Sequence, residues 1–418
     1  MKRKRRAVVI GAGVIGATSA EMLLRTGFDV TVIDAEAEPA QGASRANAGQ
    51  LCYPFAMALG NPGFLRGLPR SLLDPESGVG VSPLTVMRHW AWLAAFLRNC
   101  TEARYNRNSE RLLTLAKISM SAHAALLKRY DLKFDARQTG KLWLAPTDAA
   151  LQSAIRHLPL RRHAGFEVEA LDVGECLKVA PQLGQSKYAF AGGIYAPESP
   201  VGDCRAFTSN LIKEMQAQGV KVEFGVKASH VETSGEQVTG VRTDNGVIPA
   251  DVVVLANGLA APQLLPRRHR PAIAPLRGVS VTLPCDPSAL NVSITDPKRA
   301  VAICRLGHRL RVTGGAEFAP SGAPSRRAVR RIMDVARAWM PDAADYDTVE
   351  NQAWCGVRPT TVDSLPSISQ AGAEGLYVNA GHGSLGWTLA AGSAEILRRQ
   401  IMNADGAGRA AFDTGPNP

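Results

Sequence analysis

The sequence predicts an α/β protein, α+β overall, in which a Rossmann-like domain is combined with a second domain built on a mixed sheet. A glycine turn between an apolar strand and a helix opens the chain, and a second such turn precedes the last helix. Strand and hairpin patterns recur between them. With 418 residues, of which 45% are hydrophobic and 20% charged, the chain has the length and composition of two or three globular domains.

A βαβ unit accounts for residues 7–34. The run RAVVIGAG is a buried strand that leads into a turn, ATSAEMLLRTG is a helix, and FDVTVID is the next strand. Gly11 allows the tight turn, Gly13 lets the backbone approach a pyrophosphate, and Gly16 lets the helix pack on the strand. Asp34 ends the second strand, where its carboxylate can accept a hydrogen bond from a ribose 2′-OH. The unit therefore predicts a bound dinucleotide, either FAD or NAD.

Helical and strand patterns alternate along the rest of the chain. The pattern is helical over about 55–130, 148–165, 203–219 and 325–340, and strand-like over 141–147, 192–198, 220–258 and parts of 271–345. The nucleotide-binding domain then consists of three pieces, 1–55, 195–262 and 346–418, and the second domain of 56–194 and 263–345. Such a long insertion into a nucleotide-binding domain is usual for FAD enzymes and favours FAD over NAD.

The glycine turn near the end of the chain has too little sequence after it for a second dinucleotide site. In NAGHGSLGWTLAAG the glycines are Gly381, Gly383 and Gly386. The acid at about the required spacing, Asp405, lies in NADGAG and not at the end of an apolar strand. We therefore expect this turn to complete the site begun at the N-terminus. A helix that starts near Leu385 would then face the N1–C2=O edge of a flavin, where its positive end raises the reduction potential.

The chain carries a formal net charge of +11, part of it in the blocks KRKRR (2–6), RRHR (267–270) and RRAVRR (326–331). These blocks are either solvated surface or attract anionic lipid or an acidic partner. Nucleic acid fits poorly, because no recognition motif accompanies the charge. The apolar segment HWAWLAAFL (89–97) is either a buried helix or a membrane contact, and no uncharged apolar run is long enough to span a bilayer. The seven cysteines form no CxxC pair, which predicts reduced thiols and no metal site.

Several segments resemble the FAD-dependent D-amino acid dehydrogenases of the D-amino acid oxidase superfamily. The likeness begins with GASRANAGQL at 42–51, which is similar to the flavin-contacting segment of that superfamily. It continues in order along nearly the whole chain, through ALGNPG (58–63), LRNCTEARYNRNSERLL (97–113), GDCRAFT (202–208), RLRVTGGAEF (309–318), WCGVRPTTVDSLPSI (354–368) and GHGSLGWT (381–388). This match is far more specific than a single glycine motif.

The resemblance implies a set of residues around a non-covalently bound FAD. The pyrophosphate and ribose would be bound by Gly11, Gly13, Gly16 and Asp34, and the pyrophosphate and flavin would be lined by Ser44, Asn47, Ala48, Gly49 and Leu51. The backbone of Val226 would face the adenine, and a second phosphate-side turn would be formed by Ala256, Asn257 and Gly258. The pyrimidine end of the flavin would be covered by Gly381, Gly383, Ser384, Leu385, Gly386, Trp387 and Thr388.

Three further residues are candidates for the substrate pocket. The resemblance implies that Arg358 holds the substrate carboxylate through its planar fork, and the alternative is an ion pair with Asp363. His382 either lines the pocket near the flavin or caps the glycine turn. Tyr53 and the segment ITDPKRAVAI differ from the residues usual in this family. The substrate preference is therefore expected to differ from plain D-alanine.

The reaction implied by the resemblance is oxidation of a D-amino acid, or of a D-imino acid such as D-hydroxyproline, to a 2-oxo acid or a cyclic imine. The electrons would leave through a respiratory acceptor such as a quinone. The protein is expected to be cytoplasmic, either free or peripheral on the inner face of the plasma membrane. The alternatives that stay open are a glycine- or sarcosine-type amine oxidoreductase, an NAD-dependent dehydrogenase, and a flavin-binding subunit without turnover.

Overall fold

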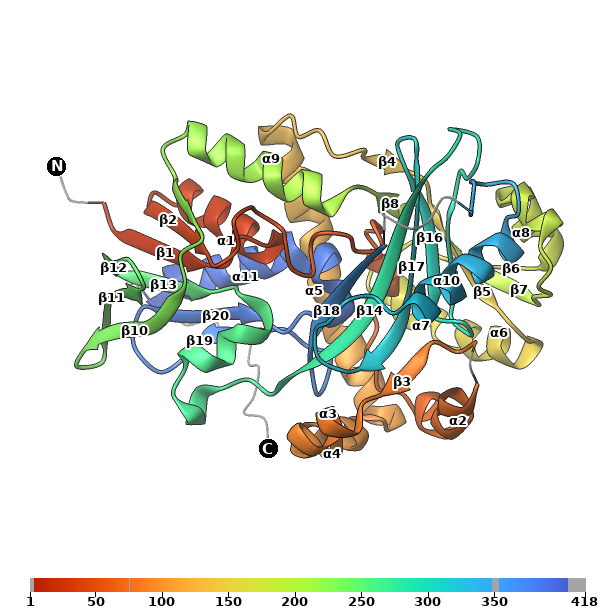
Figure 1. Cartoon of the computed structure of the whole chain (residues 1–418), viewed down its shortest axis with the longest axis horizontal. Coiled ribbons are helices and arrows are strands. Elements are labelled where there is room, and N and C mark those ends of the chain that lie inside the picture. Colours follow the sequence, from red (N-terminus) through yellow and green to blue (C-terminus); the bar gives the residue numbers. More distant parts are fainter. Residues whose placement is uncertain (1–3, 75, 348–352, 405–418) are drawn as a thin grey trace.

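Two large sheets, one in each half of an elongated molecule, organise the chain (Figure 1). The computed structural model describes residues 4–74, 76–347 and 353–404. One sheet has six strands and the other nine, and helices pack on both. This mixed architecture, with a parallel sheet behind the N-terminal glycine turn, confirms the predicted fold class.

The six-stranded sheet has the largely parallel form that the N-terminal βαβ unit predicts. Its order is β19 (Ser367–Gln370), β20 (Leu376–Ala380), β13 (Val252–Leu255), β1 (Arg6–Ile10), β2 (Asp29–Asp34) and β9 (Lys221–Phe224). All neighbouring pairs are parallel except β19 with β20. Strand β13 is buried along its whole length, as expected for a strand covered on both faces.

Helices cover one face of this sheet and a small antiparallel sheet covers the other. The helices are α1 (Val14–Arg25), α5 (Glu102–Arg129), α9 (Cys204–Ala217) and α11 (Gly386–Ala404). The small sheet consists of β10 (Ala228–Ser234), β11 (Gln237–Thr243) and β12 (Gly246–Pro249). Successive residues of β1 point to opposite faces: Val9 packs with the helices, whereas Val8 packs with the small sheet.

The nine-stranded sheet is mostly antiparallel. Its order is β18 (Ala353–Thr361), β14 (Ile273–Pro284), β17 (Arg309–Phe318), β16 (Val301–Leu306), β15 (Ser293–Asp296), β5 (Lys141–Ala145), β7 (Gly192–Ala196) and β6 (Glu169–Leu171), with β3 (Val79–Val81) beside β17. Helix α10 (Arg326–Trp339) packs on one face, where it meets Val281 and Leu283 of β14. The opposite face is free to line a cavity between the two sheets.

The other elements connect these layers. They are helices α2 (Pro62–Leu73), α3 (Pro83–Arg88), α4 (Trp90–Asn99), α6 (Asp148–Ile155), α7 (Leu158–His163) and α8 (Val173–Val179), the paired strands β4 (Arg137–Gln138) and β8 (Pro200–Val201), and the short 3-10 turns η1 (Tyr53–Phe55), η2 (Pro181–Gln185), η3 (Gly258–Leu264), η4 (Arg267–His269) and η5 (Gly383–Leu385). No helix in the described ranges combines the length and the apolar character needed to cross a membrane.

Three segments differ from the sequence-based expectations. The helix predicted over 148–165 is split into α6 and α7, because Pro159 cannot continue a helix and instead begins a new one. Strand β18 was expected in the nucleotide-binding piece 346–418, but it hydrogen-bonds along its whole length to β14 in the nine-stranded sheet. Helix α5, expected in the second domain, packs instead on α11 beside the six-stranded sheet. The expected frayed tail and Asp405 lie outside the described residues.

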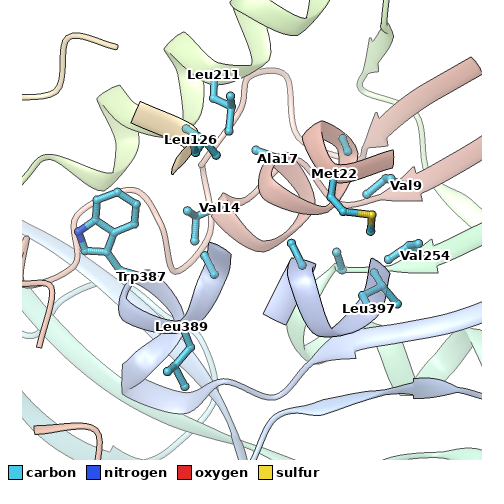
Figure 2. Close-up of a cluster of buried hydrophobic side chains, with 14 of the residues drawn as sticks. Val9, Val14, Ala17, Met22, Leu126, Leu211, Val254, Trp387, Leu389 and Leu397 are labelled. Atoms are coloured by element: carbon cyan, nitrogen blue, oxygen red, sulfur yellow. The ribbon is translucent and has the colours of Figure 1, made fainter. Parts of the chain in front are cut away.

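The helical layer is held by a continuous apolar core. Figure 2 shows side chains of α1 and α11, among them Met22 and Leu397, packed together with Val254 of the sheet. At one end of this core His123 lies among the rings of Phe134, Phe207 and Trp387 at centroid distances of 5.3–6.2 Å. This imidazole is buried, and its Nε2 has no hydrogen-bond partner in the described part of the chain. Burial lowers the pKa of His123 to about 4, so the side chain is neutral in the folded protein.

We predict that His123→Phe makes the protein less sensitive to mild acid. The pKa of His123 is lower in the folded chain than the value of about 6.5 in an unfolded one, so protons bind the unfolded chain preferentially as the pH falls below 6.5. The protonation of His123 in the unfolded chain therefore lowers the free energy of unfolding of the wild type by about 2 kcal/mol between pH 7 and pH 5. Denaturant unfolding of the wild type and the variant at both pH values measures it. The exposed His163→Gln serves as control and should follow the wild type; equal losses in the wild type and His123→Phe would contradict the prediction.

Candidate active site

A cavity of about 370 Å³ lies between the two sheets. Its walls come from the residues that follow β1, β13 and β20, from the segment 43–55, and from the free face of the nine-stranded sheet. Ligands of open parallel sheets bind beyond the carboxyl ends of the strands, and three such ends meet here. The cavity is therefore the candidate active site.

The first glycine turn is sterically specific. Gly11 has φ of +111°, and a Cβ there would lie 2.7 Å from the carbonyl oxygen of Ala256. A Cβ on Gly16 would lie 1.7 Å from the carbonyl oxygen of Gly11. Gly13 has an ordinary φ of −72° and precedes α1. Only glycine fits at the first and third positions, and the turn leaves the N-terminus of α1 open toward the cavity.

Ser44 supplies the cap that α1 lacks. The residue before α1 offers no side-chain cap, but the Ser44 hydroxyl accepts a hydrogen bond from the Val14 N–H at 3.0 Å. The N–H groups of Ile15 and Gly16 belong to the same first turn, which has no intrahelical acceptors for them. Both Val14 and Ile15 line the cavity. The helix start therefore presents free donors to an anionic group.

Asp34 lies at the end of β2, as the βαβ pattern predicts. Its carboxylate accepts hydrogen bonds from the backbone N–H groups of Ala12 at 2.5 Å and Glu36 at 2.9 Å. The N–H of Val226 donates to the Asp34 carbonyl oxygen at 2.9 Å. Asp34 and Val226 are thus neighbours, and neither of them lines the cavity.

The segment from Ser44 to Leu51 is pinned to the nine-stranded sheet. Arg311 donates to the carbonyl oxygen of Asn47 at 2.8 Å, and the Cys304 thiol donates to that of Ala48 at 3.0 Å. Gly49 has φ of +67°, where a Cβ would touch Leu306 at 3.1 Å. The backbone N–H of Leu51 donates to Pro200 at 2.9 Å. This segment consequently forms a rigid wall of the cavity.

The second glycine turn closes the cavity from the other side. Gly381 has φ of +86°, and a Cβ there would lie 2.6 Å from Thr361. The Thr388 hydroxyl accepts a hydrogen bond from the Cys52 N–H at 3.0 Å, which ties α11 to the segment above. The ring of Trp387 turns into the aromatic cluster with Phe207. All the predicted residues of this turn line the cavity, as do Ala256 and Gly258 next to Asn257: Gly381, Gly383, Ser384, Leu385, Gly386, Trp387 and Thr388.

His382 lines the cavity and does not cap the turn. Its side chain is 3% exposed and makes no capping hydrogen bond to η5. Its Nε2 has no partner among the described residues. Burial lowers the pKa of His382 to about 3, so the imidazole is neutral. Asn379, on the same wall, has a buried Oδ1 that likewise finds no partner within the described ranges.

Arg358 extends across the floor of the cavity. Its guanidinium lies over β14, where a Cβ on Gly278 would be 2.4 Å from Nη2, and Nη1 donates to the Gly315 carbonyl oxygen at 3.0 Å. No ion pair joins it to a described carboxylate, and Asp363 instead accepts from the Leu365 N–H. The alternative ion pair with Asp363 is therefore not observed. Burial lowers the pKa of Arg358, with an opposing effect of the nearby Cys355, but an arginine remains charged at neutral pH.

Tyr53 does not lie in the substrate pocket, where the sequence analysis expected it. The residue lies in η1, is 2% exposed and packs in the apolar core with Leu112 and Trp387. Burial raises the pKa of its phenol. It does not line the cavity.

The structure adds polar residues that the sequence interpretation missed. Gln50, Cys52, Lys141 and Asn379 all line the cavity, as does Trp354, whose ring lies over Gly356. The available signal for Lys141 was a single charge in the otherwise apolar strand KLWLA. All seven cysteines are free. No group of three or more metal-binding side chains occurs within the described part of the chain.

The cavity fits FAD by its chemistry. The glycine turn and the open start of α1 suit a pyrophosphate. The partnerless Asn379 Oδ1 and His382 Nε2 need polar partners on a bound group, which a flavin ring offers.

Comparison with known proteins agrees that the chain binds FAD. The family described as FAD dependent oxidoreductase matches residues 6–400. A D-amino acid dehydrogenase from Vibrio vulnificus (strain CMCP6) is 34% identical over 414 residues, covering 98% of both chains. A D-amino acid dehydrogenase from Phenylobacterium zucineum (strain HLK1) is 36% identical over 412 residues, covering 97% of this chain and 94% of the relative.

Solved structures share the fold. Glycine oxidase from Geobacillus kaustophilus superposes with a TM-score of 0.71 at 21% identity and covers 98% of both chains. L-proline dehydrogenase from P. horikoshii gives a TM-score of 0.72 at 18% identity, covering 96% of this chain and 94% of the other. The family match sets aside the NAD-dependent alternative. The chain belongs to the FAD-dependent oxidoreductase family of D-amino acid oxidase type, and its cofactor is FAD.

Proposed function

We propose that this enzyme oxidises a D-amino acid, or a D-imino acid, and passes the electrons to a quinone-type acceptor. The observation that carries the substrate class is the guanidinium of Arg358, a cation in the cavity that has no described carboxylate as partner. The carboxylate of a substrate would supply the missing partner of this guanidinium. The D-amino acid dehydrogenase names of the relatives support the D configuration.

Arg358 binds and orients the substrate in this proposal. One N–H group is used by Gly315, and the rest of the planar fork remains for a bidentate contact with a carboxylate. Because Gly278 has no side chain, the guanidinium lies flat on the sheet and leaves the space above it open. When bound, FAD supplies the two-electron oxidation of the substrate's C–N bond. The rate then depends mainly on how well the carboxylate anchor aligns the α carbon.

FAD is held at three places in this proposal. The glycine turn Gly11–Gly16 and the free amides of α1 take the pyrophosphate. Asp34 takes the ribose, and its two hydrogen bonds to backbone N–H groups keep the carboxylate in place. The segment from Ser44 to Leu51 and the turn from Gly381 to Thr388 enclose the flavin. The neutral His382 adds a hydrogen-bonding group there without adding a second charge beside Arg358.

An exposed apolar face supports a membrane-bound acceptor. Nine of the twelve large hydrophobic side chains exposed in the described residues lie between Leu59 and Leu97. They are Leu59, Leu65, Leu72, Leu73, Val81, Leu84, Met87, Trp90 and Leu97. Helix α2 buries none of its residues, and α4 buries only Phe96. Four exposed arginines accompany them: Arg66, Arg70, Arg88 and Arg98. Apolar side chains with a basic rim suit the surface of an anionic bilayer, where quinones reside.

This face, residues 59–74 and 76–98, adjoins the cavity wall. α2, α3 and α4 lie along one border of the molecule (Figure 1). The indole of Trp92 in α4 donates to the Thr360 carbonyl oxygen at 3.0 Å, and its ring stacks on Phe318. Thr360 follows Arg358 on β18 and pairs with His382. An electron acceptor bound at this face would thus be separated from Arg358 and His382 by helix α4.

Asp34→Ala should lose much of the bound FAD while the fold survives. The change removes the acceptor for the ribose and for the Ala12 and Glu36 N–H groups. The ratio of flavin absorbance to protein, read beside the far-UV circular dichroism, measures the effect. Asp29→Ala, at the exposed start of the same strand, is the control and should keep its flavin. Full flavin retention in Asp34→Ala would remove the ribose assignment.

Arg358→Lys should lower kcat/KM by roughly two orders of magnitude or more. The lysine keeps the charge but loses the fork, and each charge-assisted hydrogen bond is worth about 1.5–3 kcal/mol. Steady-state kinetics with a dye acceptor measures this on a good D-amino acid substrate. Flavin content should stay constant, and Arg330→Lys on the exposed side of α10 should behave as the wild type. Wild-type kcat/KM in Arg358→Lys, or loss of its flavin, would refute the carboxylate contact.

The triple variant Leu73→Gln, Met87→Gln, Trp90→Gln should lose membrane binding and quinone reduction together. These side chains are 85%, 74% and 68% exposed, so the fold does not depend on them. Flotation with phosphatidylglycerol vesicles should fall at least tenfold, and reduction of vesicle-borne quinone should fall with it, while dye reduction stays constant. Val173→Gln with Val247→Gln, exposed apolar residues elsewhere, is the control. Wild-type protein that does not float, or a variant that floats as well as it does, would contradict the membrane face.

A further inference from the structure

Cys52 places a thiol on the wall of the cavity. All seven cysteines lie in the described ranges and are free, and among them Cys52 alone lines the cavity. The residue is half-buried. Its backbone is fixed, because its N–H donates to the Thr388 hydroxyl at 3.0 Å and its carbonyl oxygen accepts from the Phe55 N–H at 2.9 Å. The sulfur is therefore held where a small molecule in the cavity can reach it.

A buried ammonium contacts this sulfur. Lys141 lies on β5, is 6% exposed and lines the cavity. Its Nζ lies 2.9 Å from Cys52 Sγ and 2.8 Å from Gln50 Oε1. Strand β5 is paired on both sides, with β15 and with β7, so the backbone of the lysine is as fixed as that of the cysteine. The contact between nitrogen and sulfur is thus built into the sheet and the segment that faces it.

The side chain of Gln50 keeps the two groups together. Its amide nitrogen donates to the carbonyl oxygens of Ile294 and Ile303, both at 3.4 Å, which turns its oxygen toward Lys141. The same oxygen accepts from the Lys141 ammonium and, at 3.5 Å, from the Cys52 thiol. One fixed oxygen therefore serves both groups.

The surroundings favour negative charge on the sulfur. No ion pair joins Lys141 to an acid in the described part of the chain. Asp296, the acid among the described residues of the wall, is bound to Arg299 at 3.0 Å and to the indole of Trp339 at 2.9 Å. A cation beside a cysteine stabilises the charge that the sulfur gains when the thiol loses its proton, and the thiolate is the form that attacks an oxidant.

The other six thiols lie in less reactive places. Burial raises the pKa of every one of them. The pKa reaches about 11 for Cys285 and about 12 for Cys176, Cys204 and Cys304. A thiol with a raised pKa contains little thiolate at neutral pH and reacts slowly. An oxidant that enters the cavity therefore meets its most reactive thiol at Cys52.

We propose that Cys52 and Lys141 form an oxidation site, at which a hydroperoxide joins the two side chains through an S–N bond. The Cys52 thiolate attacks one oxygen of hydrogen peroxide, the O–O bond breaks, and hydroxide leaves. The sulfur is oxidised by two electrons to a sulfenic acid, and the peroxide is reduced. This site is independent of the substrate that the enzyme oxidises.

The second step uses the neighbouring nitrogen. The released hydroxide takes a proton from the Lys141 ammonium, and the amine attacks the sulfur of the sulfenic acid. The sulfenic OH leaves with a proton of the amine as water; sulfenic acids condense in this way with protein nitrogen atoms. One thiol, one ammonium and one peroxide give one S–N bond, two water molecules and one proton. The bond removes the lysine charge from the cavity wall.

The test treats the full FAD-loaded chain with hydrogen peroxide and analyses a digest, made without reductant, by mass spectrometry. We expect a cross-linked pair of peptides that contain Cys52 and Lys141, lighter by two hydrogen atoms than the sum of the free peptides. Dithiothreitol should return both peptides to the free form. A Cys52 that stays unmodified while other cysteines are oxidised would overturn the site. A Cys52 that is oxidised to a sulfenic or sulfinic acid without the cross-link would overturn the S–N step.

Two substitutions of Lys141 separate its charge from its amine. Lys141→Arg keeps the cation but lacks the amine, so dimedone should trap a sulfenic acid at Cys52 and the cross-link should be absent. Lys141→Met removes both, and labelling of Cys52 by iodoacetamide should slow roughly tenfold or more, whereas Lys141→Arg should stay within about threefold of the wild type. Flavin absorbance verifies that each variant is folded.

A cysteine away from the cavity supplies the control. Cys285→Ser removes another half-buried thiol and should form the cross-link as the wild type does. A cross-link to Cys52 that persists in Lys141→Arg would overturn the assignment of the nitrogen to Lys141. Equal labelling of Cys52 in the wild type and in Lys141→Met would overturn the activating role of the ammonium.

Discussion

The structure depends on one short segment, Ser44–Cys52, that is hydrogen-bonded both to the nine-stranded sheet and to two helices, α1 and α11, that pack on the six-stranded sheet. At its start it caps α1 through the Val14 N–H, in its middle it accepts from Arg311 of the nine-stranded sheet, and at its end it donates to Thr388 of α11. Buried backbone groups that lose such partners cost free energy, so the two sheets cannot separate without leaving several unsatisfied. The cavity owes its shape to this constraint, because the segment sets how far the glycine turns stand from the sheet floor.

Within that frame, the chemistry of the cavity follows from where charge is left uncompensated. Arg358 and Lys141 both lie among neutral partners, and Asp296, the one acid among the described residues of the wall, is bound to Arg299. His382 is held neutral by burial. The result is a site whose fixed charges are positive, next to helix starts that also favour anions. Such a site favours anionic ligands.

Glycine creates the space that these charges need. Gly278 and Gly356 face each other across β14 and β18, and the side chains of Arg358 and Trp354 lie over them. On the outer side, α4 packs against the same β18 through Trp92. One strand thus carries Arg358 in the cavity and contacts the helix layer of the exposed apolar face through Trp92.

The sequence by itself determined the features that depend on local geometry. Gly11 and Gly16 had to be glycine because any side chain meets backbone atoms, and apolar runs with period two or 3.6 predicted most strands and helices. Which sheet a strand joins is a different matter, since only the pairing of β18 with β14, far away in the sequence, places β18 in the nine-stranded sheet. Tyr53 and Lys141 show the same limit. Tyr53 was expected in the substrate pocket and lies in the core, whereas Lys141 drew no prediction and lines the cavity. Burial and partners come from contacts far apart in sequence, and only the tertiary structure decides them.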